Sequence, residues 1–453
     1  MSSTPRNLAR AILKNAWPVL VAQCVSIGMM VVDTLIVGRH STQHLAAVAV
    51  GSGLYATLAM SLGGVLQALA PIVGQHYGAG EREGIGSDMR QGLWLAVLLT
   101  ICGGVLLADP RWLIAPAQLE ADIEAIAVNY VRLLALSLPA MLGYRAFHAA
   151  ANALGQPRPL MVIAFLETFC HALLAGILVG GHAGLPPLGA TGAALSQVVV
   201  SWISLGFSFW LLRTSPRFTP FHIFARWERP HWAAQKELLR LGVPIGFSFM
   251  VEISAFTLMA IFIARLGAET VSGHRIAANL SALVYMLPLS LAIATAAQVA
   301  QAVGAKDEAL ARGFALCGIK IACALSIVMA FALLWLRDTI AWLATSDAMV
   351  ANVAVGLAFY ISLYQFFDAV QTVACFALRA YKISFVLLLI HLGCFWGLGL
   401  GLGYWLAFHA PVPQGATGFW QAAVVATVTA AMLFGWLLLW VTRQRTQSAG
   451  PVA

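Results

Sequence analysis

Four acidic residues lie inside long apolar stretches of the chain, where a charged side chain would meet lipid unless protein or water surrounds it. Of the 18 Asp and Glu residues, these four are Asp33, Glu167, Glu252 and Asp368. A charge in the middle of a membrane helix costs on the order of 2.5–3.5 kcal/mol even on a lenient insertion scale. We therefore expect these acids to line an ion or substrate pathway, or to hold helices together through buried hydrogen bonds.

Asp368 has oxygen-bearing side chains on its own helix face. Tyr364, Gln371 and Thr372 lie at i−4, i+3 and i+4 from it, and side chains at these spacings are neighbours on a helix. A desolvated Na⁺ prefers oxygen ligands, and a carboxylate supplies the charge that it needs. The same acid can instead carry a proton. The spacing predicts a cation-coupling site, with a hydrogen-bonded structural acid as the alternative.

Glu252 is the second acid that we predict to bind the coupling ion. It follows Pro244 by eight residues, and a proline inside a helix removes a backbone hydrogen bond and loosens the helix locally. The predicted coupling set is therefore Glu252, Tyr364 and Asp368, for Na⁺ or H⁺. We expect no other metal and no organic cofactor.

Asp33 ends a polar stripe along the first apolar segment. The stripe follows the i, i+3, i+7, i+10 spacing of one helix face and consists of Gln23, Ser26, Met30 and Asp33. Such a stripe suits a cavity wall, and Met30 adds the adaptable surface that promiscuous sites use. We predict proton or substrate binding by Asp33, Gln23 and Met30. Asn279 would line the cavity of the second half or bridge helices, and Asp33 could instead reach water at a helix end.

Glu167 differs, because His171 lies one turn later at i+4. We predict that the two form a structural ion pair or hydrogen bond, with a transport role as the alternative.

The sequence contains no motif for enzymatic chemistry: there is no nucleotide-binding glycine–lysine loop, no HExxH and no Ser-His-Asp arrangement. The protein is therefore predicted not to be an enzyme.

The composition indicates that a membrane positions these residues. Of 453 residues, 60% are hydrophobic and 10% are charged, whereas soluble domains carry roughly 25% charge. This excludes soluble enzymes, disordered chains and disulfide-rich secreted modules. The chain has a net charge of +8. In a membrane protein, an excess of Lys and Arg is typical of the cytoplasmic loops, so this charge does not indicate nucleic-acid binding. The fold class predicted is an all-α polytopic membrane protein.

A helix needs about 20 apolar residues to span a bilayer. By this measure we count twelve spans, over residues 16–38, 46–74, 91–109, 124–147, 159–181, 189–213, 239–264, 272–300, 313–336, 348–372, 383–407 and 417–441. The distribution of Lys and Arg between loops then places both termini in the cytoplasm, in a protein of the inner (plasma) membrane. The predicted organisation is a six-helix lobe over 1–213, a cytoplasmic linker over 214–238 and a second six-helix lobe over 239–453.

The two lobes form an internal repeat at an offset of 226 residues. Pro18 aligns with Pro244, Arg39 with Arg265, and Gln75 with Gln301. Composition bias explains a few matches among apolar helices, but matched Pro, Arg and Gln at one offset are harder to explain in this way. With six spans in each half, both halves enter the membrane from the same side, so the repeat is parallel. Secondary transporters use this plan, with sites near the bilayer midplane.

Taken in order along the chain, these features resemble the MATE family of multidrug and toxic compound extruders over about residues 10–440. The resemblance rests on Pro18, Val32-Asp33-Thr34 with Gly38, Gln75-His76-Tyr77-Gly78, Leu154 to Pro159, His274 to Asn279, Met286-Leu287-Pro288 and Gln301 to Ala305. Glu252 with Tyr364 and Asp368 resembles the NorM-type branch. Two departures are Arg275 after His274, and Ala380 where a glycine commonly follows the arginine at 379.

The resemblance implies export of cationic amphipathic compounds in exchange for Na⁺ or H⁺, by a monomer in the lipid bilayer. Glu252, Tyr364 and Asp368 match cation-binding residues of the family, and Asp33 matches an acid linked to protonation and drug binding. A flippase for lipid-linked saccharides and another twelve-helix carrier remain alternatives. The former would need a more basic cavity, and a major-facilitator carrier would need a basic motif that residues 78–84 lack. A channel or receptor would not exchange ions for substrate.

Overall fold

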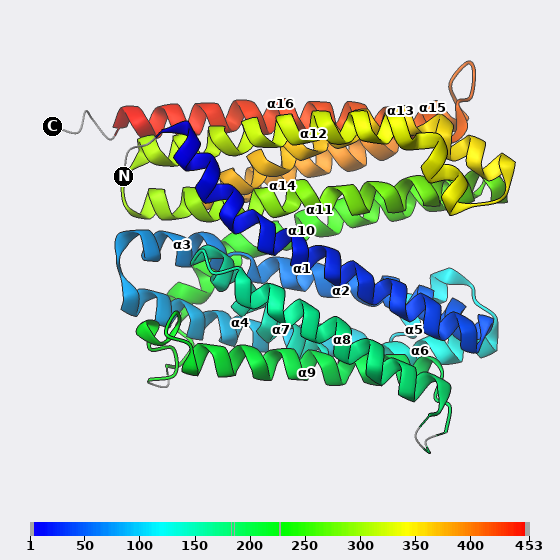
Figure 1. Ribbon diagram of the computed structural model, residues 1–453, viewed down its shortest axis with the longest axis horizontal. Helices are drawn as coiled ribbons and strands as arrows, with labels where there is room; N and C mark the ends of the chain where they lie inside the picture. The colour runs from blue at the N-terminus through cyan, green and yellow to red at the C-terminus, as the bar shows by residue number, and fades with distance from the viewer. Residues whose placement is uncertain (1–3, 183, 185, 226–227, 449–453) are drawn as a thin grey trace. The chain divides into compact units, whose positions relative to one another are not determined.

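The computed structural model describes residues 4–182, 184, 186–225 and 228–448, and within these ranges the regular structure is helical throughout. The first half of the chain contains α1 (Pro5–His40), α2 (Thr42–Leu66), α3 (Leu69–Ala79), α4 (Arg82–Ala108), α5 (Arg111–Ile114), η1 (Ala115–Ala117), α6 (Ala121–Ala135), α7 (Leu138–Ala153), α8 (Arg158–Gly180), α9 (Ala190–Thr214) and η2 (Thr219–Phe221). The second half contains α10 (Trp232–Ala264), α11 (Ala268–Gly304), α12 (Glu308–Ala344), α13 (Ala348–Ala380), α14 (Phe385–His391), the π-helix η3 (Leu392–Leu402), α15 (Gly403–Phe408) and α16 (Gly415–Ser448) (Figure 1).

The predicted all-α membrane fold is confirmed. In the described part of the chain, 11 helical segments are long and apolar enough to cross a membrane, and a twelfth results if α6 and α7, which bend by 50° at their junction, count as one span. The predicted span 46–74 corresponds to α2 and α3, and the predicted span 383–407 to α14, η3 and α15. α11 and α12, of 37 residues each, reach about 55 Å at 1.5 Å per residue. They therefore extend beyond a hydrocarbon core of about 30 Å.

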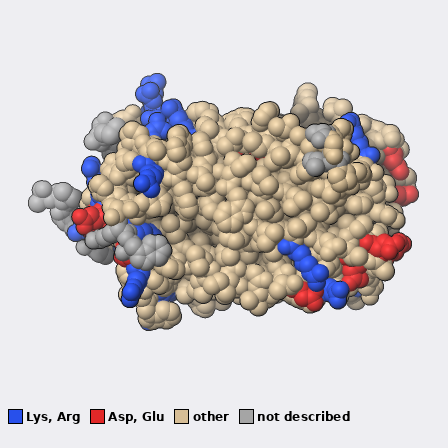
Figure 2. All heavy atoms as spheres, turned by 90° about the horizontal axis from the view of Figure 1, so that it is seen from below, with Lys and Arg blue, Asp and Glu red and all other residues tan. Residues whose placement is uncertain are grey.

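Large apolar side chains cover the outside of the helices. Examples are Val105 at 71% exposure, Phe331 at 73% and Trp335 at 84%. On the face drawn in Figure 2, Lys, Arg, Asp and Glu gather toward the helix ends and leave a broad band almost without charge between them. Contiguous apolar surface of this kind is rare on soluble monomers and is what lipid tails solvate. The helices are therefore built to lie in a bilayer.

The chain forms two compact units, which we call the N-unit (residues 21–246) and the C-unit (residues 1–20 and 247–453). The N-unit core contains Leu66, Leu95 and Phe147, and the C-unit has cores around Phe434 and around Trp420, all at most 1% exposed. In the C-unit, α11, α12 and α16 pack against α13. Because α13 lies among three long helices, its polar side chains are held away from lipid.

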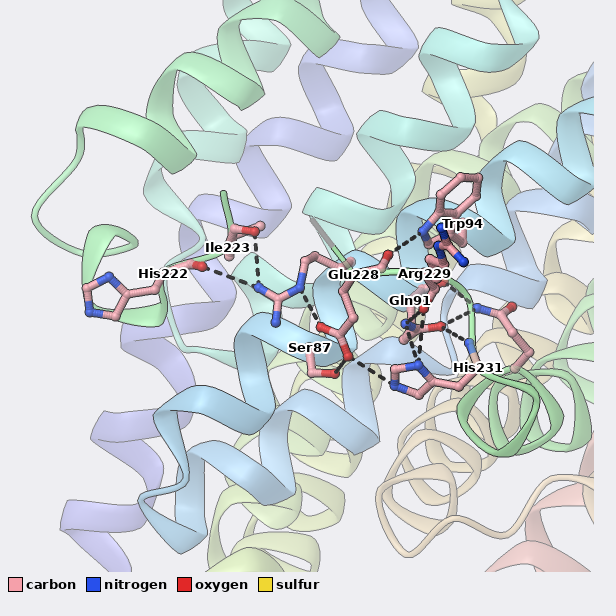
Figure 3. Close-up of polar contacts among 10 residues, drawn as sticks. Ser87, Gln91, Trp94, His222, Ile223, Glu228, Arg229 and His231 are labelled. Carbon is pink, nitrogen blue, oxygen red and sulfur yellow. Dashed lines mark hydrogen bonds and ion pairs between the residues drawn. The ribbon is translucent and has the colours of Figure 1, made fainter. Parts of the chain in front are cut away.

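The segment after α9, which we predicted to be a linker, is anchored to α4 within the N-unit (Figure 3). The Arg90 guanidinium donates from Nε to Glu228 Oε2 at 2.6 Å and from Nη1 to the carbonyl oxygens of His222, at 3.3 Å, and Ile223, at 3.1 Å. The Ser87 hydroxyl donates to Glu228 Oε1 at 2.8 Å. One carboxylate and one guanidinium therefore join the two sides of this contact.

A second group of bonds continues the anchor into the start of α10. Gln91 Nε2 donates to the carbonyl oxygen of Arg229 at 3.0 Å, and Trp94 Nε1 donates to that of Glu228 at 2.9 Å. Gln235, in the first turn of α10, donates to the Gln91 carbonyl oxygen at 2.9 Å. Residues 222–223 and 228–229 and the beginning of α10 are thus attached to one helix, α4.

Glu228 is an acid whose surroundings favour its charged form. Burial by itself would raise the pKa of Glu228, but hydrogen bonds from Ser87 and Arg90 and the charges of Arg90 and His231 together lower it. His231 Nε2 lies 3.0 Å from Glu228 Oε1. The carboxylate is 17% exposed, so this ion pair is shielded from water more than an ordinary surface pair is.

Candidate cation and substrate sites

Asp368 lies in the middle of α13 and is 1% exposed. Gln371 Nε2 donates to Asp368 Oδ1 at 2.9 Å and also lies 3.4 Å from Thr372 Oγ1. The Tyr364 hydroxyl, on the preceding turn, is hydrogen-bonded to the same carboxylate. The i−4, i+3 and i+4 spacing therefore places phenol, amide and hydroxyl groups around one buried acid.

Gln371 also directs an oxygen into this buried region. Its Oε1 atom is buried and has no hydrogen-bond partner among the described residues. A buried oxygen of this kind is normally satisfied by protein, water or an ion. Asp368 contributes carboxylate oxygens one turn away, so the region holds both carboxylate and amide oxygens, the ligand type that a hard cation prefers.

Glu252 and Tyr285 come to the same place from two other helices of the C-unit. Glu252, on α10, is partly exposed, and its carboxylate repels that of Asp368 and attracts Arg379. Tyr285, on α11, interacts with both carboxylates and is hydrogen-bonded to Thr372. The structure therefore brings together the three residues predicted to bind the cation. It adds Tyr285, which no periodic pattern in the sequence identified.

Arg379, near the end of α13, is the positive charge of this cluster. It is 7% exposed, and its guanidinium carbon lies 5.1 Å from the Phe249 ring centroid and 4.6 Å from that of Phe376. Its Nε and Nη1 atoms are buried and have no hydrogen-bond partner among the described residues. Cation–π contacts thus hold a guanidinium within electrostatic reach of Glu252 without pairing it directly to a carboxylate.

The π-helix η3 supports α10 next to Glu252. Trp396 Nε1 donates to the carbonyl oxygen of Val251 at 3.3 Å and to Ser254 Oγ at 3.1 Å. Close by is a small cavity of about 20 Å³, room for roughly one water molecule, lined in part by Phe256, Met259, Tyr364, Phe395 and Leu400. π-Helical turns often occur at functional sites.

In the N-unit, His171 pairs with Asp33 and not with Glu167, so our predicted Glu167–His171 pair is wrong. His171 Nε2 lies 2.7 Å from Asp33 Oδ1, and His171 Nδ1 lies 2.9 Å from Ser196 Oγ. Glu167 instead interacts electrostatically with Arg145 of α7. His171 pairs with a residue on another helix and not with Glu167 one turn away, because its ring faces α1 and α9 and is fully buried there.

The other predicted substrate-binding residues lie outside these two clusters. Met30 is 64% exposed, Gln23 is half-buried on the same helix as Asp33, and Asn279 is exposed on α11. Ser26 donates its hydroxyl proton back to the carbonyl oxygen of Ala22 at 2.9 Å. Their roles in binding stay predictions.

A helical membrane fold with buried acids between its helices is typical of membrane transporters. The MatE family model matches residues 18–177 and again residues 244–405. The two matches begin at residues 18 and 244, 226 residues apart, which is the predicted repeat offset. The chain belongs to the MatE family.

Several relatives are similar along nearly their whole length. "Probable multidrug resistance protein NorM" of Aromatoleum aromaticum is 48% identical, over 96% of this chain and 95% of the relative. "Multidrug resistance protein NorM" of Vibrio vulnificus is 31% identical over 97% of both chains. "Multidrug resistance protein PmpM" of Pseudomonas aeruginosa is 34% identical over 94% of this chain and 90% of the relative.

Solved structures show the same fold at lower identity. The eukaryotic MATE transporter AtDTX14 superimposes with a TM-score of 0.89 and 19% identity over 98% of both chains. A MATE structure in the straight conformation superimposes with a TM-score of 0.88 and 17% identity over 97% of both chains. The predicted two-lobed, all-α fold is thereby confirmed.

Proposed function

We propose that this protein is a secondary antiporter that exports cationic amphipathic compounds in exchange for Na⁺ or H⁺. The observation that carries the proposal is the pair of carboxylates, Glu252 and Asp368, with one guanidinium, Arg379, inside the membrane-spanning helices of the C-unit. The names of the multidrug resistance relatives support the substrate class.

The charge of this cluster supports a site for one monovalent cation. With both acids ionised, Glu252 and Asp368 contribute −2 and Arg379 contributes +1, which leaves −1. One Na⁺, one H⁺ or one monovalent organic cation therefore neutralises the cluster. A second cation would give it an uncompensated positive charge, which is costly at membrane depth.

Exchange follows if the coupling ion and the substrate cannot neutralise the cluster together. An ion that binds from outside then displaces the organic cation, and a new substrate displaces the ion on the inside. The coupling requires only that each ligand binds the inward- and outward-facing states with different affinity. The membrane potential adds about 2.3 kcal/mol per charge per 100 mV.

The remaining assignments complete the proposal. Asp33, with Gln23 and Met30 on α1, contributes proton or substrate binding in the first lobe (1–213), and Asn279 contributes in the second lobe (239–453). The protein acts as a monomer in the inner membrane. Both termini lie in the cytoplasm, because Lys and Arg concentrate in the loops on that side. Tyr364 and the carboxylates of Glu252 and Asp368 supply the ligands if Na⁺ is the ion.

The test measures the movement of an organic cation across the membrane of proteoliposomes that contain the purified protein. Na⁺ and pH gradients are imposed separately. Export of an organic cation such as tetraphenylphosphonium is expected to follow one of the two gradients. The double variant Glu252→Gln with Asp368→Asn should abolish this coupling. Glu269→Gln, an exposed acid at the start of α11, is the matched control and should transport normally. Coupling that survives in the double variant would show that the mechanism is wrong.

A further inference from the structure

We infer that the N-unit binds a phospholipid with a negatively charged headgroup in a pocket between α4 and the segment after α9. The pocket has a volume of about 350 Å³. Its lining comes from α4, between Arg90 and Val97, and from Ile223, Phe224 and Glu228 of the facing segment. Pockets for small molecules begin at about 300 Å³. This pocket lies within the N-unit, whereas the proposed coupling acids belong to the C-unit, so the two sites are distinct.

Arg90 keeps hydrogen-bond donors for a ligand in this pocket. Its side chain is 10% exposed. The Nε atom donates to Glu228, and Nη1 donates to the carbonyl oxygens of His222 and Ile223 (Figure 3). The third nitrogen, Nη2, donates no hydrogen bond to any described residue. Because a guanidinium carries five N–H donors in a planar fork that matches phosphate oxygens, Nη2 is suited to a phosphate group.

Glu228 does not make the pocket a cation site. Three side chains already lie within 3.0 Å of its carboxylate oxygens, those of Ser87, Arg90 and His231. Arg90 and Glu228 together carry no net charge. Arg229, the next residue, is exposed and adds +1, and the bond from Trp94 Nε1 to the Glu228 carbonyl oxygen, at 2.9 Å, holds this part of the segment against α4. One phosphate with a single negative charge is therefore balanced, whereas an ammonium headgroup would compete with the existing partners of Glu228.

The apolar wall of the pocket continues into the exposed side of α4. Val97 lines the pocket and is 49% exposed, and Ile101 and Val105 follow at i+4 and i+8 with 60% and 71% exposure. Side chains at these spacings share one helix face. From Val97 to Val105 a helix rises about 12 Å, which is most of the roughly 15 Å depth of one leaflet. An acyl chain can therefore lie along this face while its headgroup reaches the pocket.

A phospholipid satisfies both parts of the pocket, and a free phosphate satisfies only one. Inorganic phosphate would accept from Arg90 but would leave the apolar side chains of Leu93 and Phe224 uncovered. Trp94, which also lines the pocket, is the residue type that gathers at the level of lipid headgroups. Basic pockets beside membrane helices bind anionic headgroups in this way. The orientation proposed above assigns the lipid to the cytoplasmic leaflet, and binding itself depends only on the pocket.

The experiment is photo-crosslinking of the full chain in phosphatidylcholine nanodiscs that contain a phosphatidylglycerol probe with a diazirine on its acyl chain. Labelled residues are mapped by mass spectrometry of proteolytic peptides. Labelling is expected at residues 93–97 and 223–224 and should exceed that by a phosphatidylcholine probe with the same diazirine. Arg229→Gln should reduce this preference about fivefold. The matched control is Arg443→Gln, an exposed base on α16, which should leave the preference unchanged.

Val97→Trp tests the apolar part of the pocket. Because Val97 is half-exposed, the larger ring can cover the pocket without entering the protein core. Over-filling should reduce labelling at residues 223–224 about tenfold. Ile101→Trp makes the same kind of change one turn further along the same face, outside the pocket, and should leave that labelling intact. Equal labelling in the two variants would overturn the inference.

Competition separates a bound lipid from other sources of phosphate. Unlabelled phosphatidylglycerol should displace the probe, and excess inorganic phosphate should not. Displacement by inorganic phosphate would assign the pocket to a free anion and overturn the inference. Equal labelling by the two lipid probes would show only ordinary bilayer contact and would overturn it as well. Since these measurements use no organic cation and no ion gradient, the lipid site and the proposed antiport mechanism can fail independently of each other.

Discussion

The Arg379 guanidinium lies 5.1 Å from the centroid of the Phe249 ring, one helical turn before Glu252 on α10. This contact places a permanent positive charge within electrostatic reach of Glu252 without pairing it directly to the carboxylate. Two of its nitrogens are buried without partners in the described structure, so the guanidinium can strengthen its interaction with Glu252 when the transported cation leaves. In the proposed antiport cycle, Arg379 therefore competes with the cation for the Glu252 carboxylate.

Replacing Arg379 should therefore tighten cation binding and slow its release. In Arg379→Gln the cluster keeps a charge of −2 instead of −1, and we expect the affinity for the coupling ion to rise about tenfold, in the usual range of 1–3 kcal/mol for coupling between sites. Export should slow, because the ion leaves less readily. Isothermal titration and proteoliposome flux measure the two effects. Arg379→Lys, which restores the charge, and Arg275→Gln on the exposed side of α11 are the controls.

Gln371 and Gln365 lie on the same helix and should respond differently to truncation. Gln371→Ala removes a hydrogen bond that stabilises the ionised Asp368 carboxylate, worth about 1.5–3 kcal/mol, so proton affinity at this acid should rise roughly 10- to 100-fold. Gln365 donates to the carbonyl oxygen of Ser281 at 2.7 Å and joins α13 to α11. Gln365→Ala should lower the melting temperature while ion affinity changes little. Equal effects of the two variants on affinity would contradict the assignment of Gln371.

The Glu228–Arg90 pair should make the stability of the N-unit depend on pH. The pKa of Glu228 is lower in the folded protein than its unfolded value of about 4.3. Its contribution is therefore fully present above pH 4.3 and is lost as the pH falls through the lower folded value. The difference in melting temperature between wild type and Glu228→Gln should be constant from pH 8 to 6 and shrink below pH 4.3. A difference that does not change with pH would show that the charge is not involved.

Gly86 permits the close approach of the anchored segment to α4. A Cβ atom at this position would lie 2.3 Å from the carbonyl oxygen of Phe221, and backbone cannot move aside cheaply. Gly86→Ala should thus reduce stability and loosen the segment, measured by melting temperature and by hydrogen exchange at residues 218–223. Gly104, on the same helix, has no atom within 4 Å of a Cβ. Gly104→Ala should be neutral or stabilising by about 0.5–1 kcal/mol.

Residues of the site that share one helix face could be predicted from their spacing, whereas residues that meet from different helices could not. Tyr364, Asp368 and Gln371 share a face of one helix, so their sequence separation alone brings them together. Tyr285 comes from another helix, and its approach depends on how α11 and α13 are rotated about their axes. In helices that are apolar on all sides, periodicity does not determine this rotation. The same limit explains why His171 was paired with the wrong acid.

The spans and the repeat could be predicted because they depend on length and composition. Twelve apolar stretches, one of them bent by 50° between α6 and α7, account for the fold. The offset of 226 is recovered in the two family matches. The segment after α9 could not be predicted in the same way, because its composition is polar and rich in proline. Its residues 222–223 and 228–229 are held by Arg90 and Gln91, about 140 residues away along the chain.

The attachment of residues 218–223 and 228–231 to α4 determines where the chain can be split into two fragments or can accept an inserted domain. A fragment that stops at residue 213 would leave the Arg90 side chain without its carboxylate partner and expose the apolar surface that Phe218 and Phe221 cover. Separately expressed halves divided anywhere from residue 214 to residue 235 would therefore lose contacts with α4, and a reporter domain inserted there would separate partners that are in contact. The exposed turn at residues 411–413, with Val412 at 75% exposure, is the better insertion point.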